Sequence, residues 1–216
     1  MKYKRIEQAK FISRPNRFIA KVMVDGREET VHVKNTGRCK ELLLPDATVY
    51  LEKSDNPNRK TLYDLVAVDT DIGIINIDSQ APNAVVKEWL QTKDYSKVVP
   101  EYKYGNSRID FYMEKGDDRY LMEVKGCTLI EDGIGYFPDA PTERGVKHLR
   151  ELTGAVKQGY KARIAFVIQV NGVSQVRPNV KIHPEFGVAL NEAIEAGVEV
   201  LYLKCNVTED EIYIIE

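Results

Sequence analysis

Cysteine and histidine are both scarce in this sequence, and neither is spaced to form a cluster. The 216 residues contain three cysteines (Cys39, Cys127 and Cys205) and three histidines. The cysteines are odd in number and far apart, which excludes a disulfide framework, and the scattered histidines disfavour a zinc site. Long apolar runs and an N-terminal signal core are also absent, which predicts no membrane partner. Unpaired cysteines suit a reducing compartment, so we predict a cytoplasmic protein.

A surplus of positive charge is missing too. The net charge is −2 and the isoelectric point is near 6.0. Any nucleic-acid site must therefore be a local cluster of cations. The hydrophobic fraction of 43% supplies a core, and the length fits one large domain or two small ones. No obligate protein partner is evident.

Two acids and one lysine lie on a predicted hairpin in the middle of the chain. Segments 107–114 and 119–125 are rich in apolar and aromatic residues, as strands are, and a short polar turn separates them. An antiparallel pairing about that turn places Asp110 directly opposite Glu123. Because side chains alternate along a strand, Lys125 shares a face with Glu123.

Opposed carboxylates repel, so this arrangement predicts a cation between them. Carboxylate oxygens suit a hard divalent ion, Mg²⁺ or Mn²⁺. Such an ion polarises a phosphoryl oxygen and activates water, while a lysine stabilises the developing charge or orients that water. We therefore predict Asp110 and Glu123 as metal ligands, and both with Lys125 as the catalytic residues of a phosphodiester-hydrolysing site. Residue types alone also allow a merely solvated hairpin face.

The first 80 residues read as all-β. The predicted strands are Arg17–Asp25, Glu29–Lys34, Thr48–Lys53, Leu62–Thr70 and Ile72–Ile77. Asp25 and Gly26 form a strong hairpin turn between the first two. Five short strands fit a small barrel of the OB type, with a small sandwich as the alternative.

Residues 81–216 alternate helices and strands, which predicts an α/β (α+β) domain around a mixed central sheet. A helix is predicted to begin after Asn83 as its N-cap, ahead of the hairpin. The later elements are a strand near Thr128–Glu131, a helix over Thr142–Gln158 capped by Gly159, a strand over Arg163–Val170, a helix from Pro184 to Gly197, and strands over Val198–Lys204 and Glu211–Ile215.

Several short motifs occur in order over nearly the whole chain. They are Asn35-Thr36-Gly37-Arg38, Ser54-Asp55-Asn56-Pro57, Ser107-Arg108-Ile109-Asp110-Phe111, Glu123-Val124-Lys125, Phe137-Pro138-Asp139-Ala140 and the segment from Thr142 to Leu152. Together they resemble the sugar fermentation stimulation protein A family, and the element order resembles the PD-(D/E)xK nuclease fold. The resemblance implies an OB-like β-barrel domain over 1–80, a nuclease-like domain over 81–216, and DNA binding without strong sequence preference. It also implies a regulatory role in sugar (maltose) metabolism.

Four further residues each have a functional and a structural interpretation. Glu88 would complete the metal shell, as a helical carboxylate does in nuclease-like folds, or is an exposed helical acid. Glu143 lies in the first turn of its predicted helix, where the helix dipole favours a negative charge, or it supports the site. His148 is either a general base or structural. Gln169 interrupts an apolar run, so its amide either bonds within the sheet or reaches the region of Lys125.

Cations in the barrel loops and near the hairpin are predicted to contact nucleic acid. Arg144 and Lys147 share one side of their helix and would meet phosphate oxygens near the metal, or form an ordinary soluble helix face. The prediction for the barrel cations is based mainly on the family resemblance and on the cationic grooves with which OB folds bind single strands. The predicted set is Arg14, Arg17, Arg38, Lys40, Arg59, Arg108, Arg144 and Lys147.

These features predict a DNA-binding protein that carries a divalent-metal-dependent nuclease site, with RNA left open as a partner. The alternative is a non-catalytic DNA-binding regulator that keeps the nuclease-like fold. A hydrolase of a small phosphate ester is a weaker third hypothesis, since a small substrate needs no second binding module.

Overall fold

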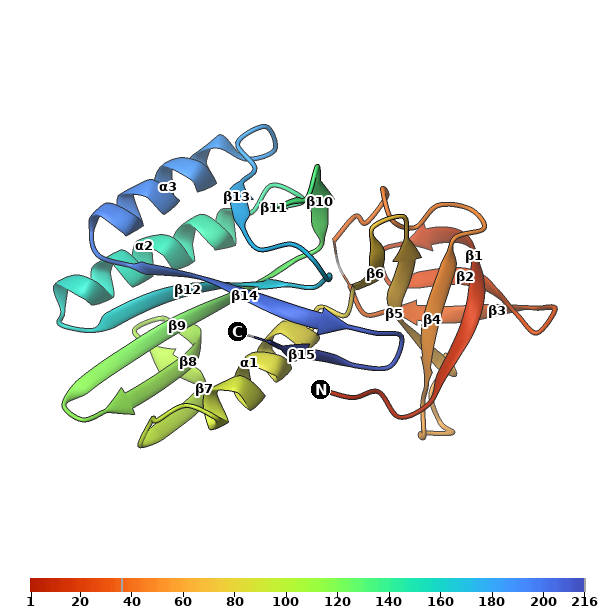
Figure 1. The fold of residues 1–216 in the computed structure, drawn as a ribbon, viewed down its shortest axis with the longest axis horizontal. Coiled ribbons are helices and arrows are strands. Elements are labelled where there is room, and N and C mark those ends of the chain that lie inside the picture. The colour runs from red at the N-terminus through yellow and green to blue at the C-terminus, as the bar shows by residue number, and fades with distance from the viewer. Residues whose placement is uncertain (36, 216) are drawn as a thin grey trace.

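The computed structural model describes residues 1–35 and 37–215, so Thr36 of the Asn35–Arg38 motif lies outside the described residues. A small β-barrel formed by the first part of the chain lies beside a larger sheet that carries helices on both faces (Figure 1). The predicted fold class, a barrel followed by a mixed α+β sheet region, is confirmed. The helices of the described residues are too short or too polar to cross a membrane.

Within the described residues the barrel contains six strands. They are β1 Ile6–Asn16, β2 Ile19–Val24, β3 Arg27–Val33, β4 Thr48–Lys53, β5 Tyr63–Thr70 and β6 Gly73–Asn76. Their order is β3-β2-β1-β4-β5-β6, and a parallel pairing of β3 with β5 closes the barrel. The predicted turn joins β2 to β3, with φ of 48° at Asp25 and 77° at Gly26, as a two-residue hairpin requires.

Strand β1 is absent from the sequence prediction. Its charged residues and Pro15 argue against a strand, yet it pairs with both β2 and β4. The pairing with β2 is irregular toward the end that contains Pro15, which is how the ladder accommodates a residue without an N–H.

The larger sheet has the order β15-β14-β12-β9-β8-β7. Its elements in chain order are α1 Ala81–Gln91, β7 Lys97–Tyr104, β8 Ser107–Lys115, β9 Asp118–Cys127, α2 Glu143–Lys157, β12 Lys161–Ile168, α3 Pro184–Glu195, β14 Glu199–Val207 and β15 Ile212–Ile214. A small separate sheet contains β10 Leu129–Glu131, β11 Ile134–Phe137 and β13 Val176–Pro178. Strands β9, β12 and β14 run parallel and the others antiparallel, so the sheet is mixed.

Two elements differ from their sequence predictions. The helix α1 begins at Ala81, with Gln80 at its N-cap, so Asn83 lies inside the first turn rather than before it. The predicted strand near Thr128–Glu131 exists as β10 but pairs outside the main sheet. The main sheet's third antiparallel strand is β7, an edge strand whose Pro100 obscured it in the sequence.

Helices cover both faces of the large sheet (Figure 1). Residues of α2 and α3 pack with one set of strand side chains, including Leu121 and Ile164. Residues of α1 pack with the alternate set, including Met122 and Ala165. The strictly alternating directions of a strand thus produce two cores from one sheet.

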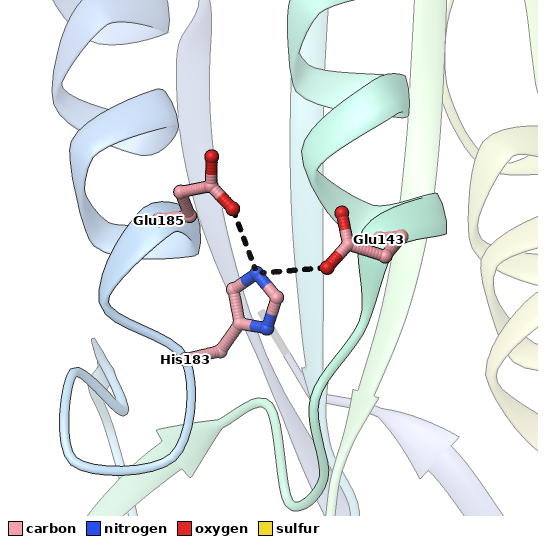
Figure 2. A group of neighbouring side chains, drawn as sticks. All are labelled: Glu143, His183 and Glu185. Atoms are coloured by element: carbon pink, nitrogen blue, oxygen red, sulfur yellow. Dashed lines mark ion pairs between the residues drawn. The ribbon is translucent and has the colours of Figure 1, made fainter.

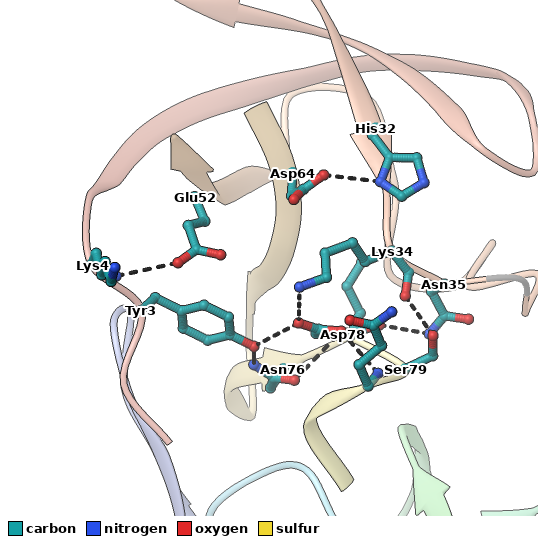
Figure 3. A network of polar contacts seen from close by, with 12 residues as sticks. Tyr3, Lys4, His32, Lys34, Asn35, Glu52, Asp64, Asn76, Asp78 and Ser79 are labelled. Carbon is teal, nitrogen blue, oxygen red and sulfur yellow. Dashed lines mark hydrogen bonds and ion pairs between the residues drawn. The ribbon is translucent and has the colours of Figure 1, made fainter. Parts of the chain in front are cut away.

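A buried polar network links Tyr3, Asn76 and Asp78 in the barrel part of the chain (Figure 3). Gln169, which directly follows β12, connects this network to the large sheet. Gln169 donates from Nε2 to both the backbone oxygen and Oδ1 of Asn76, each at 3.0 Å, and the Asn76 N–H returns a bond to the Gln169 oxygen. The fully buried Asp78 accepts from Lys34 at 2.7 Å and from the Tyr3 hydroxyl at 3.2 Å. A network with this many mutual bonds holds the two sheets in one orientation.

Candidate active site

The β8–β9 hairpin has the predicted register. Its ladder begins with Lys115 opposite Asp118 and extends to Phe111 opposite Met122. The regular ladder ends at that pair, one residue before Asp110 and Glu123, so the predicted pairing of these two acids is not part of it. The parallel pairing of β9 with β12 continues past this point and supports Glu123 and Lys125 from the other side.

Strand β8 is irregular at Asp110. Ile109 packs in the core under α2 and α3, whereas Phe111 packs in the core against α1, although residues two apart in a regular strand share a face. Across from Asp110 on β7, Glu101 has a φ of 52°, which is rare for a residue with a side chain. Strain of this kind gathers at functional sites.

Asp110 uses its irregular position to reach two donors. Its Oδ2 accepts the Val124 N–H at 2.8 Å, and its Oδ1 accepts the Asn83 side-chain amide at 2.9 Å. Asn83 comes from α1 on the opposite face of the sheet, so helix and hairpin together hold this carboxylate.

Glu123 lies at the end of a hydrogen-bonded chain. Arg144 donates from Nε to His148 Nε2 at 3.2 Å, so the neutral imidazole carries its proton on Nδ1, which contacts Glu123 Oε1. Lys125 donates to the same oxygen at 2.6 Å. Both donors converge on Oε1, and Oε2 is buried without a hydrogen-bond partner in the described part of the chain.

The two carboxylates have opposite electrostatic environments. Burial, followed by the nearby Glu123 charge, raises the pKa of Asp110 above its ordinary value. Burial alone would also raise the pKa of Glu123, but the bond from His148 and the charge of Lys125 hold that pKa below its ordinary value. Adjacent acids with pKa values pushed apart are a recurrent property of catalytic sites.

A cleft of about 760 Å³ runs beside this chain of residues. Its lining includes His148 and four cations, Arg108, Arg144, Lys147 and Arg150. All four cations are exposed, although Lys147 lies 3.6 Å from Glu151. Three of them belong to the predicted nucleic-acid set. The fourth, Arg150, was not predicted, although it follows Lys147 by the same three-residue step that separates Arg144 from Lys147.

Glu88 does not join the two acids. Its carboxylate accepts from the Met1 ammonium at 2.6 Å and is 56% exposed. It follows Asn83 by five residues, roughly 140° around the helix, so the two residues face different neighbours. The residue of α1 that reaches the site is Asn83, and Pro82 in the first helical turn was the signal that could have placed Asn83 inside the helix.

Gln169 and Glu143 also lie outside the immediate contacts of the two acids. The side-chain amide of Gln169 bonds to Asn76 and Asp78 at the junction with the barrel. A Cβ on Gly126, next to Lys125, would lie 2.3 Å from Gln169 Oε1 and 2.9 Å from Pro82 Cγ, so any larger residue there would have to displace one of them. Glu143 is the first residue of α2, exposed at the cleft rim.

The barrel cations differ in how available they are. Arg14 donates to four backbone oxygens, of Arg17, Asn35, Gly37 and Arg38, at 2.7–2.9 Å. Arg59 forms a two-bond pair with Asp64 at 2.5 and 2.8 Å. Arg17, Arg38 and Lys40 are exposed.

Comparison with known proteins gives consistent matches along the chain. The model described as "SfsA N-terminal OB domain" matches residues 12–77, and that described as "Sugar fermentation stimulation protein RE domain" matches residues 80–211. A sugar fermentation stimulation protein homolog of Clostridium beijerinckii is 54% identical over 218 residues, covering 99% of this chain and 96% of the relative. One of Desulfitobacterium hafniense is 52% identical over 215 residues, covering 98% and 94%.

A solved structure covers this chain completely. It is that of Pyrococcus furiosus SfsA in complex with Ca²⁺, at 28% identity and a TM-score of 0.87, and the match includes 95% of that chain.

Proposed function

The chain belongs to the sugar fermentation stimulation protein family, and we propose that it is a DNA-binding protein with a divalent-metal-dependent phosphodiesterase site at Asp110, Glu123 and Lys125. In this proposal residues 1–80 form a nucleic-acid-binding module and residues 81–216 carry the chemistry. We place the protein in the cytoplasm, with DNA as its main partner.

The observation that carries the proposal is the buried Oε2 of Glu123. A buried carboxylate oxygen without a partner is costly unless something pairs with it. Asp110 lies beside it with a pKa raised by burial and by Glu123, which a neighbouring cation would relieve. Two carboxylates suit Mg²⁺ or Mn²⁺, which bind one or two carboxylates together with waters and substrate phosphate, and Ca²⁺ in the Pyrococcus furiosus relative favours a divalent ion.

A cation held by Asp110 and Glu123 would polarise a phosphoryl oxygen and lower the pKa of a water. The protein's own groups set the geometry. Lys125 reaches the same point from β9 and can stabilise charge that develops on the phosphate. Asn83 and the Val124 N–H fix the orientation of Asp110.

His148 acts as a positioning residue in this scheme rather than as a general base. Its two ring nitrogens are both engaged, Nε2 as an acceptor from Arg144 and Nδ1 in contact with Glu123. Although it lies in the cleft lining, it is only 4% exposed, so neither nitrogen is free to take a proton from substrate. Arg144, exposed in the cleft, would bind phosphate and relay its position to Glu123 through His148.

The test is a cleavage assay with purified protein. Single- and double-stranded DNA and RNA are incubated with Mg²⁺ or Mn²⁺, and wild type is compared with Asp110→Ala and Glu123→Ala. We expect metal-dependent cleavage to be lost in both variants while DNA binding is largely kept. Glu88→Gln is the matched control, an acid of the same domain that should cut like wild type.

Binding of DNA equally well in EDTA, with no cleavage of any substrate by wild type, would instead support the non-catalytic regulator. Cleavage of RNA alone would keep the site and change the substrate. Both outcomes are read from the same gels.

A further inference from the structure

A second group of acidic side chains lies where α2 and α3 begin. Glu143 is the first residue of α2, and Glu185 lies in the first turn of α3, which follows its N-cap residue His183. One ligand atom from each of the three side chains lies within 4.8 Å of the others. Figure 2 shows the two carboxylates converging on the imidazole from their separate helices.

The position of each glutamate alone has an ordinary explanation, because an acid in the first turn of a helix is favoured by the helix dipole. His183 has no such explanation. Its side chain is only 7% exposed, and its Nε2 is buried without a hydrogen-bond partner within the described residues. Burying an unpaired polar group costs free energy, so this nitrogen indicates that something completes the cluster.

The tautomer of His183 identifies its role. Nδ1 accepts the backbone N–H of Thr142 at 3.2 Å, so the proton of the neutral ring is on Nε2. Nε2 points at Glu143 Oε1 and Glu185 Oε2, each 3.9 Å away, beyond hydrogen-bond reach. In this tautomer Nε2 can only act as a hydrogen-bond donor and has no lone pair to offer a metal.

We propose that Glu143 and Glu185 bind a hydrated hard divalent cation, and that His183 orients their carboxylates. Without a cation the like charges repel and stay out of reach of Nε2–H. A bound cation cancels that repulsion, so a carboxylate oxygen can close on Nε2–H and satisfy it. Hydrogen-bonded ligand carboxylates of this kind are the usual support of a metal site.

The donor set determines which cations fit. Bonds of roughly 2.0–2.6 Å from Mg²⁺, Mn²⁺ or Ca²⁺ to oxygen span the gap between two carboxylates this close. Zinc is disfavoured because it would need the nitrogen that carries the proton. The glutamates are 85% and 63% exposed, so waters fill the other positions. The site is separate from Asp110 and Glu123 and does not depend on hydrolysis.

Calcium titration of the full chain tests this proposal. Calorimetry on wild type should count two Ca²⁺ ions. Glu185→Gln and Glu143→Gln should each weaken one of the two sites at least tenfold, whereas Asp110→Asn should weaken only the other. Glu195→Gln, an exposed acid at the far end of α3, is the control and should leave both sites unchanged.

Nuclear magnetic resonance of the three histidines gives a second readout. The His183 signals should move on Ca²⁺ addition in wild type and in Asp110→Asn but not in Glu185→Gln, with the proton remaining on Nε2. Unchanged Ca²⁺ binding in both glutamate variants, or His183 signals that ignore Ca²⁺, would overturn the proposal. Loss of the Nε2 proton on metal addition would overturn the role given to His183.

Discussion

The barrel and the α2 cleft both carry cations, but they use them differently. In the barrel, Arg14 is bound to four carbonyl oxygens and Arg59 is paired with Asp64. In the cleft, Arg108 and Lys147 are exposed beside the candidate active site. Cations of the same types are thus structural at Arg14 and Arg59 of the barrel and available to a polyanion in the cleft. Internal hydrogen bonding, rather than charge, separates the two.

The largest expected effect concerns Arg14. Arg14→Ala should lower the free energy of unfolding by about 1–3 kcal/mol, because backbone oxygens in the loop that follows β3 lose their donors. Arg14→Lys should be nearly as destabilising, since an ammonium cannot replace the guanidinium fork. Urea unfolding measures both. If Arg14→Lys is as stable as wild type, the hydrogen bonds of the Arg14 guanidinium do not stabilise the loop that follows β3.

The cleft should respond in the opposite way. Arg108→Ala with Lys147→Ala should weaken DNA binding about tenfold at physiological salt and reduce the slope of log affinity against log salt by about 2, with stability unchanged. Neither residue touches Asp110 or Glu123. Lys157→Ala, an exposed cation on the same helix but outside the cleft lining, is the control. An unchanged salt slope in the double variant would mean that DNA binds outside this cleft.

Sequence reasoning succeeded where a local rule decides the geometry. The register of the β8–β9 hairpin follows from a short turn and a repeat of two, and the pairs from Lys115 to Phe111 match it. The cap role predicted for Gly159, which has a positive φ just after α2, likewise follows from short-range chemistry. These rules needed no knowledge of distant contacts.

Sequence reasoning failed where contacts between residues far apart in the chain determine the geometry. Pro100 belongs to a strand because β7 is at the sheet edge, which the local sequence does not reveal. The contact of Asn83 with Asp110 joins residues 27 positions apart. The break in β8 at Asp110, which turns that carboxylate toward α1, is invisible in an alternating pattern.

The two acids of the candidate site offer a smaller, pH-dependent test. Because its folded pKa is raised, Asp110 favours the folded state only at low pH, and that contribution is lost as pH rises through the raised pKa. Glu123 has a lowered pKa, so its contribution is present at neutral pH and lost as pH falls. In metal-free buffer at pH 7.5, Asp110→Asn should therefore raise Tm by a few degrees and Glu123→Gln should lower it.

Scanning calorimetry from pH 3 to 8 measures these differences, which should shrink toward the acidic end as both carboxyls become protonated. With added Mn²⁺ the Tm of wild type should exceed that of Asp110→Asn, because wild type binds an ion that the variant binds poorly. Equal melting temperatures for Asp110→Asn and wild type at pH 7.5 would contradict the electrostatic difference between the acids.

The smallest expected effect concerns the exposed barrel cations. Single substitutions Arg17→Ala, Arg38→Ala and Lys40→Ala should each reduce the salt slope of DNA binding by at most about 0.9, because each can neutralise at most one phosphate. Arg27→Ala, an exposed barrel cation outside the predicted set, is the control. If the three variants all match wild type while the cleft variant does not, DNA contacts only the cleft and the barrel serves another purpose. Reduced slopes in both regions would mean that DNA contacts both the cleft and the barrel.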